Sequence, residues 1–217
     1  MNLSSLIKQY FPTAESEVTV VEFEGENVGD VHKHVINVLM QQTDIEMTVI
    51  KALEYCLYEV LDNVIIHSDS QQGIVLMHFN PSVNTLSILV ADEGIGVKAS
   101  LAKNEKYCTL SEQEALRLCI EDKVTDGEGM GFGLYATSLL DQKAGLLFEI
   151  RSGSHTMQII DGVVSTHDSD FWQGAIVYMQ LQTNKVINPQ EVVEYRTDVE
   201  DEFDTLFLND KEIEELW

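Results

Sequence analysis

The sequence predicts an α/β (α+β) two-layer sandwich, in which helices cover one face of a mixed, largely antiparallel sheet. The first observation behind this prediction is the order of periodic segments, which runs strand, helix, helix, strand pair, helix and further strands. The second is the turn "PSVN", which joins two adjacent strands directly. The third is the composition: 44% hydrophobic and 23% charged residues among 217 are ordinary for a globular protein with a sizeable core.

The first half of the chain supplies five elements. The segment "EVTVVEFEG" alternates apolar and polar residues, as a half-buried strand does. In the longest helix, apolar residues recur every three or four positions and form one buried stripe of Ile50, Leu53, Leu57, Leu61 and Val64. We expect a strand over 17–25, helices over 28–42 and 45–66, and strands over 73–80 and 85–92.

The second half begins with a polar connection over 97–128, which we interpret as a candidate lid. It contains a helix, because Ser111 followed by Glu114 has capping-box spacing. Its basic residues either pair with nearby acids or close on a bound phosphate: Lys98, Lys103, Lys106, Arg117 and Lys123. After it we expect a helix over 132–145 and strands over 146–153, 155–161 and 175–183.

We divide the chain into a domain over 1–187 and an acidic C-terminal extension over 188–217. From Glu191 to Trp217 there are eleven Asp or Glu residues against Arg196 and Lys211. Such runs are usually solvated, although the apolar residues of "FDTLFL" would also allow docking on the domain or on a partner.

The net charge of −24 argues against nucleic acid as a partner, because a phosphate backbone needs a basic surface. No apolar run reaches the ~20 residues of a membrane span, and the first residues lack the features of a secretion signal. We therefore expect a cytoplasmic protein without a membrane partner. Three cysteines without CxxC spacing argue against a disulfide framework and a zinc site.

Glu59 and Asn63 lie four residues apart on the helix over 45–66, so both project from its polar face, with His67 one turn further on. An amide oxygen can ligate Mg²⁺, while a carboxylate can orient or deprotonate a nucleophile. An ordinary solvated helix face is the alternative for Glu59 and Asn63. His67 either packs against a neighbouring loop, caps its helix or contacts a phosphate.

Two clusters of glycine follow. In "DEGIGV", Asp92 ends a strand, and Gly94 and Gly96 let the main chain turn close to a ligand. A carboxylate there can accept a hydrogen bond from an exocyclic amine such as that of adenine. In "GEGMGFGLY", four alternating glycines precede a predicted helix: Gly127, Gly129, Gly131 and Gly133.

Main-chain N–H groups at such a loop and helix start attract an anion without a lysine, which would let an acidic chain hold ATP with Mg²⁺. Ordinary turns are the alternative. The dinucleotide fingerprint does not fit, because counting GxGxxG from Gly127 puts Phe132 at the last glycine position. The P-loop does not fit either, because the sequence contains no Gly-Lys dipeptide.

Taken in order, "EVLDNVIIHS", "DEGIGV" and "GEGMGFGLY" resemble the N box and the two glycine boxes of the GHKL ATPase superfamily. That superfamily includes gyrase, heat-shock chaperone ATPases, histidine kinases and MutL repair proteins. The resemblance covers about residues 45–183 and implies the Bergerat fold. The N box is more similar to that of bacterial anti-sigma factor serine kinases than to that of histidine kinases, and the segment after the second glycine box resembles stand-alone bacterial histidine-kinase-like ATPases.

The resemblance implies a role for each site residue. Glu59 would be the general base, Asn63 the Mg²⁺ ligand and Asp92 the adenine contact, with Gly94 and Gly96 forming the turn beneath it. The phosphate cradle and its neighbours complete the expected nucleotide-binding set: Gly127, Gly129, Met130, Gly131, Phe132, Gly133, Leu134 and His67. One departure is Ala175 after Gly174, where family members often have Thr.

The expected function is therefore Mg²⁺-ATP binding, with ATP hydrolysis or transfer of the γ-phosphate to Ser or Thr of a partner protein in a regulatory role. The alternative is a non-catalytic, nucleotide-gated module that binds a protein. Some similar proteins are encoded beside STAS-like partners, so a STAS-like or other regulatory protein is the expected partner. The oligomeric state is open, with a dimer as one option.

Overall fold

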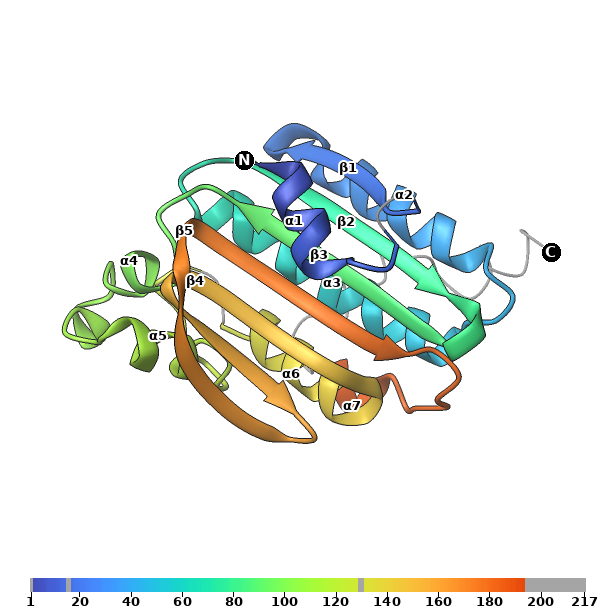
Figure 1. The fold of residues 1–217 in the computed structure, drawn as a ribbon. Helices are drawn as coiled ribbons and strands as arrows, with labels where there is room; N and C mark the ends of the chain where they lie inside the picture. Colours follow the sequence, from blue (N-terminus) through green and yellow to red (C-terminus); the bar gives the residue numbers. More distant parts are fainter. Residues whose placement is uncertain (1, 15–16, 129–130, 194–217) are drawn as a thin grey trace.

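The computed structural model describes residues 2–14, 17–128 and 131–193, which form an α+β fold around one open sheet (Figure 1). The strands follow the order β1-β2-β3-β5-β4, and every neighbouring pair is antiparallel. Their bounds are β1 Thr19–Glu24, β2 Gln72–Asn80, β3 Thr85–Asp92, β4 Gly145–Ile160 and β5 Val163–Gln182. The predicted sandwich is confirmed, and within the described residues its sheet is wholly antiparallel.

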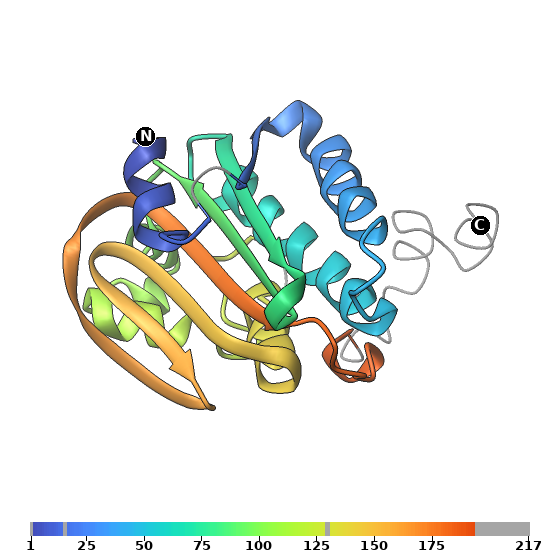
Figure 2. The same cartoon turned by 45° about the vertical axis from the view of Figure 1, so that its right-hand side comes forward.

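Three long helices cover one face of the sheet (Figures 1 and 2). They are α2 Val28–Met40, α3 Met47–His67 and α6 Gly133–Ala144, and they enclose the main hydrophobic core. The apolar stripe predicted for α3 lies in this core, and its members are at most 5% exposed: Ile50, Leu53, Leu57, Leu61 and Val64. Burial of this stripe fixes the rotation of α3, so its polar face is directed to the end of the sheet where the glycine loops lie.

The other face of the sheet carries a helix that periodicity did not reveal. This helix is α1 Leu3–Tyr10, and its Leu6 and Tyr10 pack on Leu89 and Tyr178 in a second, smaller core. The Tyr10 hydroxyl also donates a hydrogen bond of 2.6 Å to the buried Glu149 carboxylate. Eight residues are too few for a helical repeat to stand out in the sequence.

The prediction of three strands after α6 is wrong, because the structure has one long hairpin of β4 and β5. The two strands expected over 146–153 and 155–161 are a single strand, which passes through register shifts near Gly153. β5 begins at Val163, twelve residues before its expected start at 175. The added part, 163–174, is mostly exposed and polar, so it lacks the apolar alternation that marks a half-buried strand.

The connection over 97–128 contains α4 Val97–Leu101 and α5 Glu112–Leu118. The capping box of Ser111 and Glu114 is present as predicted. However, Ala115 and Leu116 are only 1% exposed and belong to the main core. The Glu112 carboxylate also accepts a hydrogen bond of 3.0 Å from the Ser154 N–H of β4. α5 is therefore a packed wall beside the sheet and not a free-standing lid.

The described chain remains packed beyond residue 187, where we expected the domain to end. A short helix, α7 Gln190–Val193, places Val192 in the main core at 2% exposure. The remaining residues of the acidic extension, 194–217, lie outside the described residues. No described helix is both long enough and apolar enough to cross a bilayer.

Candidate functional site

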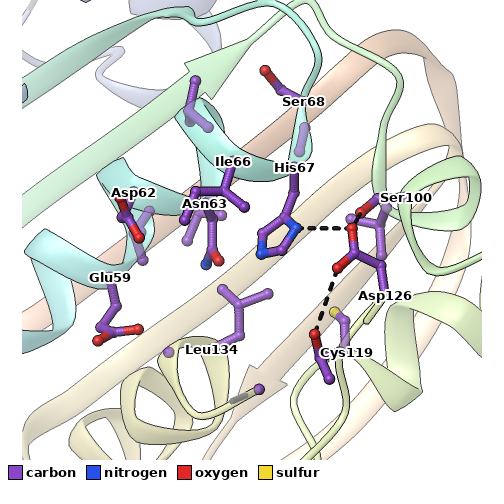
Figure 3. Close-up of a pocket in the computed structure, with 18 of the residues that line it drawn as sticks. Glu59, Asp62, Asn63, Ile66, His67, Ser68, Ser100, Cys119, Asp126 and Leu134 are labelled. Atoms are coloured by element: carbon purple, nitrogen blue, oxygen red, sulfur yellow. Dashed lines mark hydrogen bonds and ion pairs between the residues drawn. The ribbon is translucent and has the colours of Figure 1, made fainter. Parts of the chain in front are cut away.

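The three sequence motifs meet at one cavity of about 360 Å³. Its walls come from α3, the end of β3, α4 and the loop before α6 (Figure 3). Most of the predicted site residues line it: Glu59, Asn63, His67, Asp92, Gly96, Gly131, Phe132, Gly133 and Leu134. Gly94 and Gly127 lie outside its lining, and Gly129 and Met130 lie outside the described residues.

The polar face of α3 forms one wall of the cavity. Glu59 and Asn63 are half-buried there and lie one helical turn apart, with His67 one turn further along (Figure 3). Asp62 also lines the cavity, although sequence reasoning did not select it. Burial raises the pKa of Asp62 above its ordinary value, and His67 partly offsets this effect. The face therefore presents an amide and two carboxylates to the same cavity.

Asp92 ends β3 at 4% exposure and is held by main-chain donors. Its Oδ1 accepts a hydrogen bond of 2.7 Å from the Gly94 N–H, and its Oδ2 accepts one of 3.3 Å from the Ala175 N–H. Burial raises the pKa of Asp92 to about 6, even though these two hydrogen bonds favour the ionised form. Asp92 therefore faces the cavity in a fixed position, with a pKa well above that of an ordinary aspartate.

Gly94 packs the turn after β3 against the end of α3. A Cβ at Gly94 would lie 2.0 Å from the Ser68 carbonyl oxygen, which is closer than any side chain allows. The same Ser68 oxygen accepts a hydrogen bond of 2.8 Å from the Ile95 N–H. Gly94 thus allows the turn after β3 to pack closely on the end of α3, while the neighbouring Gly96 lines the cavity.

The N-terminus of α6 reaches the same cavity. Gly133 is the first residue of this twelve-residue helix, and a Cβ there would lie 2.8 Å from Glu59 Oε2 and 2.9 Å from Glu59 Cβ. Only a glycine lets the helix start this close to α3. The first turn of a helix has N–H groups without intrahelical acceptors and carries a partial positive charge, so this end of α6 suits an anion.

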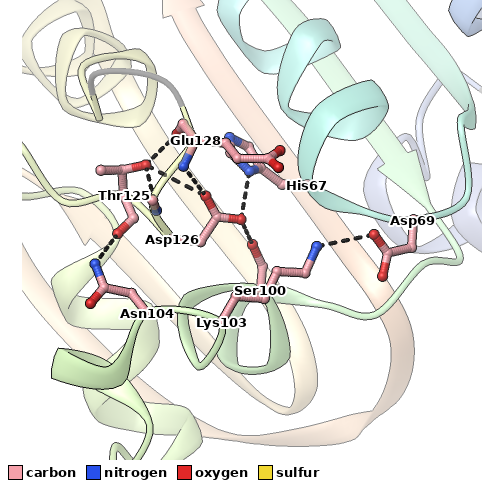
Figure 4. A network of polar contacts seen from close by, with 9 residues as sticks. His67, Asp69, Ser100, Lys103, Asn104, Thr125, Asp126 and Glu128 are labelled. Atoms are coloured by element: carbon pink, nitrogen blue, oxygen red, sulfur yellow. Dashed lines mark hydrogen bonds and ion pairs between the residues drawn. The ribbon is translucent and has the colours of Figure 1, made fainter.

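A network that the sequence did not reveal is centred on Asp126, directly before the second glycine cluster (Figure 4). Asp126 Oδ2 accepts hydrogen bonds from His67 Nδ1 at 2.9 Å and from the Ser100 hydroxyl at 3.0 Å. Its Oδ1 accepts one of 3.1 Å from the Glu128 N–H. Burial alone would raise the pKa of Asp126, but these hydrogen bonds together lower it below its ordinary value. A carboxylate next to the glycines was the only sequence signal for this residue.

The network shows that His67 packs against the loop before α6, while a phosphate contact of its ring stays a prediction. Its Nδ1 is bonded to the loop before α6, while the ring lines the cavity. The basic residues of 97–128 do not line the cavity: Lys103 pairs with Asp69 at 3.0 Å, and Arg117 donates to the Thr166 hydroxyl at 2.9 Å. In the described structure Lys103 and Arg117 therefore make surface contacts.

The charge of the lining is strongly negative. Among the described lining residues there is no Lys or Arg, but there are five carboxylates: Glu59, Asp62, Asp92, Asp126 and Glu128. An anionic ligand would therefore need a cation at its side. No cluster of three His, Cys, Asp or Glu side chains suited to a metal occurs in the described part of the chain. Mg²⁺ in phosphate sites commonly takes only one or two protein ligands beside phosphate oxygens and waters, so the Asn63 amide and a neighbouring carboxylate fit that ion.

No protein-family model matches the chain, and no curated protein matches it either.

Proposed function

We propose that the chain binds Mg²⁺-ATP in this cavity as a GHKL-type ATPase or protein kinase. It would hydrolyse ATP or transfer the γ-phosphate to a Ser or Thr hydroxyl of a partner protein, in a regulatory role. The observation that carries the proposal is that Glu59, Asn63, Asp92 and the N-terminus of α6 all line one cavity. Its volume of about 360 Å³ lies within the usual range for ligand pockets.

The lining of the cavity contains groups suited to both parts of a nucleotide. Apolar side chains of the sheet and of α4 would contact the base: Val90, Leu101, Ile150 and Val177. The Asp92 carboxylate would accept a hydrogen bond from the exocyclic amine of adenine. Gly133 and Leu134 open α6, where main-chain N–H groups would bind phosphate oxygens.

Asn63 would hold Mg²⁺ through its side-chain oxygen. When bound, the ion supplies the positive charge that the protein lacks here and neutralises the phosphate oxygens. Without a cation, the five carboxylates of the lining would repel a triphosphate. The acidic lining is therefore compatible with the metal complex of ATP and unfavourable to free ATP.

Glu59 would act as the general base. Its carboxylate would take the proton of a water molecule or a hydroxyl group as that oxygen attacks the γ-phosphorus. The bond between the γ-phosphorus and the bridging oxygen breaks, and ADP leaves. A base of this kind contributes about 10²–10⁴-fold to the rate. Glu59 lies close to the start of α6, since a Cβ at Gly133 would be 2.8 Å from its Oε2, so the base is adjacent to the phosphate-binding end of that helix.

The test uses γ-labelled ATP with Mg²⁺ and follows the released or transferred phosphate. We expect turnover in the wild type and a loss of about 10²-fold or more in Glu59→Gln, with nucleotide affinity almost unchanged. Glu121→Gln is the matched control, because Glu121 is exposed and lies outside the cavity. Equal rates in wild type and Glu59→Gln would remove Glu59 from this role. Tight binding without any turnover, alone or with a partner, would favour the nucleotide-gated binding module.

A further inference from the structure

One edge of β5 is paired with another strand over only part of its length. From Ile176 to Gln182 β5 lies between β3 and β4. From Val163 to Ala175 it pairs with β4 alone, and no other described strand lies on its second edge. In Figures 1 and 2 this part of β5 curves along the outside of the molecule. Alternate residues of an antiparallel strand direct their N–H and C=O groups away from the paired neighbour. This edge is therefore a row of main-chain donors and acceptors without a strand partner in the described structure.

Proteins usually protect such an edge with charged residues, especially lysine, or with proline. Here the residues from Val163 to His167, "VVSTH", include no charged residue and no proline. This is notable in a chain with a net charge of −24. The neighbouring apolar side chains are also exposed, with Ile160 at 46%, Val163 at 65% and Val164 at 44%. The edge therefore has the features of a pairing surface.

We propose that this edge, Val163–Ser169, pairs antiparallel with the same edge of a second copy, so that the two sheets continue across a homodimer. The edge is complementary to itself around its centre. A two-fold axis at Thr166 places Val164 opposite Asp168 and Ser165 opposite His167. An axis at His167 places Thr166 opposite Asp168 and Ser165 opposite Ser169. Neither register brings like charges together, whereas an axis at Asp168 would set two carboxylates face to face.

The absence of charge at the centre of this edge favours a second copy of the chain as its partner. Two molecules of this acidic protein repel each other over most of their surface. They approach most favourably where carboxylates are few: Val163 to His167 carries none, and Asp168 beside it faces Val164 or Thr166 of the other copy in the two registers. The main chain of each copy would satisfy the outward donors and acceptors of the other, which is the way edge strands recognise extended segments.

The proposed dimer contact would lie on the same strand as a residue that holds the candidate site. β5 runs on from this edge to Ala175, whose N–H group holds Asp92. Thr166 accepts a hydrogen bond from Arg117 of α5, so the edge is additionally supported by the wall beside the cavity. The dimer itself does not depend on the proposed nucleotide chemistry, and its test needs no nucleotide.

The test is sedimentation equilibrium of the full chain over a range of concentrations, with variants at Thr166. Thr166→Glu places a carboxylate opposite its own copy in one register and opposite Asp168 in the other, so it creates like-charge pairs in both. Thr166→Val is the matched control, because it also removes the hydroxyl that accepts from Arg117 but adds no charge. We expect reversible dimers for the wild type and Thr166→Val, and at least about fivefold weaker dimerisation for Thr166→Glu.

Thr166→Lys distinguishes the two axes. A lysine opposite its own copy weakens the dimer, whereas a lysine opposite Asp168 strengthens it. Circular dichroism checks that each variant is folded. A wild type that stays monomeric at the highest concentration would overturn the proposal. So would a dimer that neither Thr166→Glu nor Thr166→Lys alters, because that dimer would form through another surface or pair this edge with a different segment.

Discussion

His67 and Asp126 are 59 residues apart in the sequence, and their side chains meet at 2.9 Å between Nδ1 and Oδ2. This contact joins the C-terminal end of α3 to the loop that precedes α6 (Figure 4). Ser100 of α4 donates to the same carboxylate oxygen at 3.0 Å. Three walls of the cavity are therefore held by one buried acid.

Asp126→Asn should destabilise the protein by about 1–3 kcal/mol at neutral pH, because an NH₂ group replaces one of two accepting oxygens and leaves buried donors unpaired. The measurement is chemical denaturation. Because the pKa of Asp126 is lowered in the fold, its stabilising effect is present above the ordinary Asp pKa and is lost as the pH falls through the lowered value. The gap between the wild type and Asp126→Asn should therefore shrink in acid.

The matched control for Asp126→Asn is Asp69→Asn. Asp69 also belongs to an ion pair, but its side chain is 57% exposed, and such surface pairs contribute little. If Asp126→Asn is as stable as Asp69→Asn at neutral pH, the hydrogen bonds to Asp126 do not stabilise the fold.

Gly133→Ala should disrupt the site although alanine favours helices. The new Cβ would lie 2.8 Å from Glu59 Oε2, so either α6 or Glu59 must shift. We expect nucleotide affinity to fall about tenfold or more, because a displaced helix start misplaces its N–H donors. Gly29→Ala in α2 is the control, since nothing lies within 4 Å of a Cβ there, and it should be neutral or stabilising. Normal nucleotide binding by Gly133→Ala would contradict the proposed phosphate site.

Asp92 should make adenine binding depend on pH. Burial raises its pKa to about 6, and only the ionised carboxylate accepts a hydrogen bond from the exocyclic amine with both oxygens available. ATP affinity should therefore fall about tenfold between neutral pH and about pH 5, where roughly a tenth of the carboxylate is ionised. Calorimetric titrations at several pH values measure this change. Asp92→Asn should bind ATP weakly and lack the pH dependence, and an unchanged pH profile in that variant would exclude Asp92 as its origin.

Asp141 of α6 should reduce stability at neutral pH. It is 8% exposed, its Oδ1 has no hydrogen-bond partner in the described structure, and burial raises its pKa to about 6. An acid with a raised pKa stabilises the fold below the ordinary Asp pKa, and that contribution is lost as the pH rises through about 6. Asp141→Asn should thus be more stable to unfolding than the wild type by about 1–2 kcal/mol at neutral pH, with little difference near pH 4. Chemical denaturation at the two pH values measures this difference. A variant that is equally stabilised at both pH values would contradict the role of ionisation.

The sequence predicted the parts of the fold that have a strong apolar period. The stripe of α3 spans several helical turns, and its burial fixed where Glu59 and Asn63 point. The first half of β5 has no such period, because its residues are mostly exposed, and α1 is too short to show one. Both elements are set by pairing and packing with distant segments, which local periodicity does not record.

The sequence also predicted which motifs would meet at the cavity, while the roles of their residues stay predictions. Asp62, Ser100 and Asp126 were not found, because their position at the site comes from tertiary contacts. Nothing in the sequence around Asp126 indicates that the fold places His67 beside it. Burial is likewise what raises the pKa of Asp92 to about 6, and no local pattern reports that burial.

Binding of Mg²⁺-ATP in the cavity is tested by calorimetric titration of the wild type with Mg²⁺-ATP, Mg²⁺-ADP and Mg²⁺-GTP, together with ATP in the presence of a chelator. We expect saturable 1:1 binding of both adenine nucleotides, much weaker binding of GTP, and loss of ATP binding when Mg²⁺ is removed or when Asn63 is replaced by Ala. Absence of binding heat, confirmed by an unchanged melting temperature with Mg²⁺-ATP, would contradict this expectation. Equal binding of ATP with and without Mg²⁺ would contradict it as well.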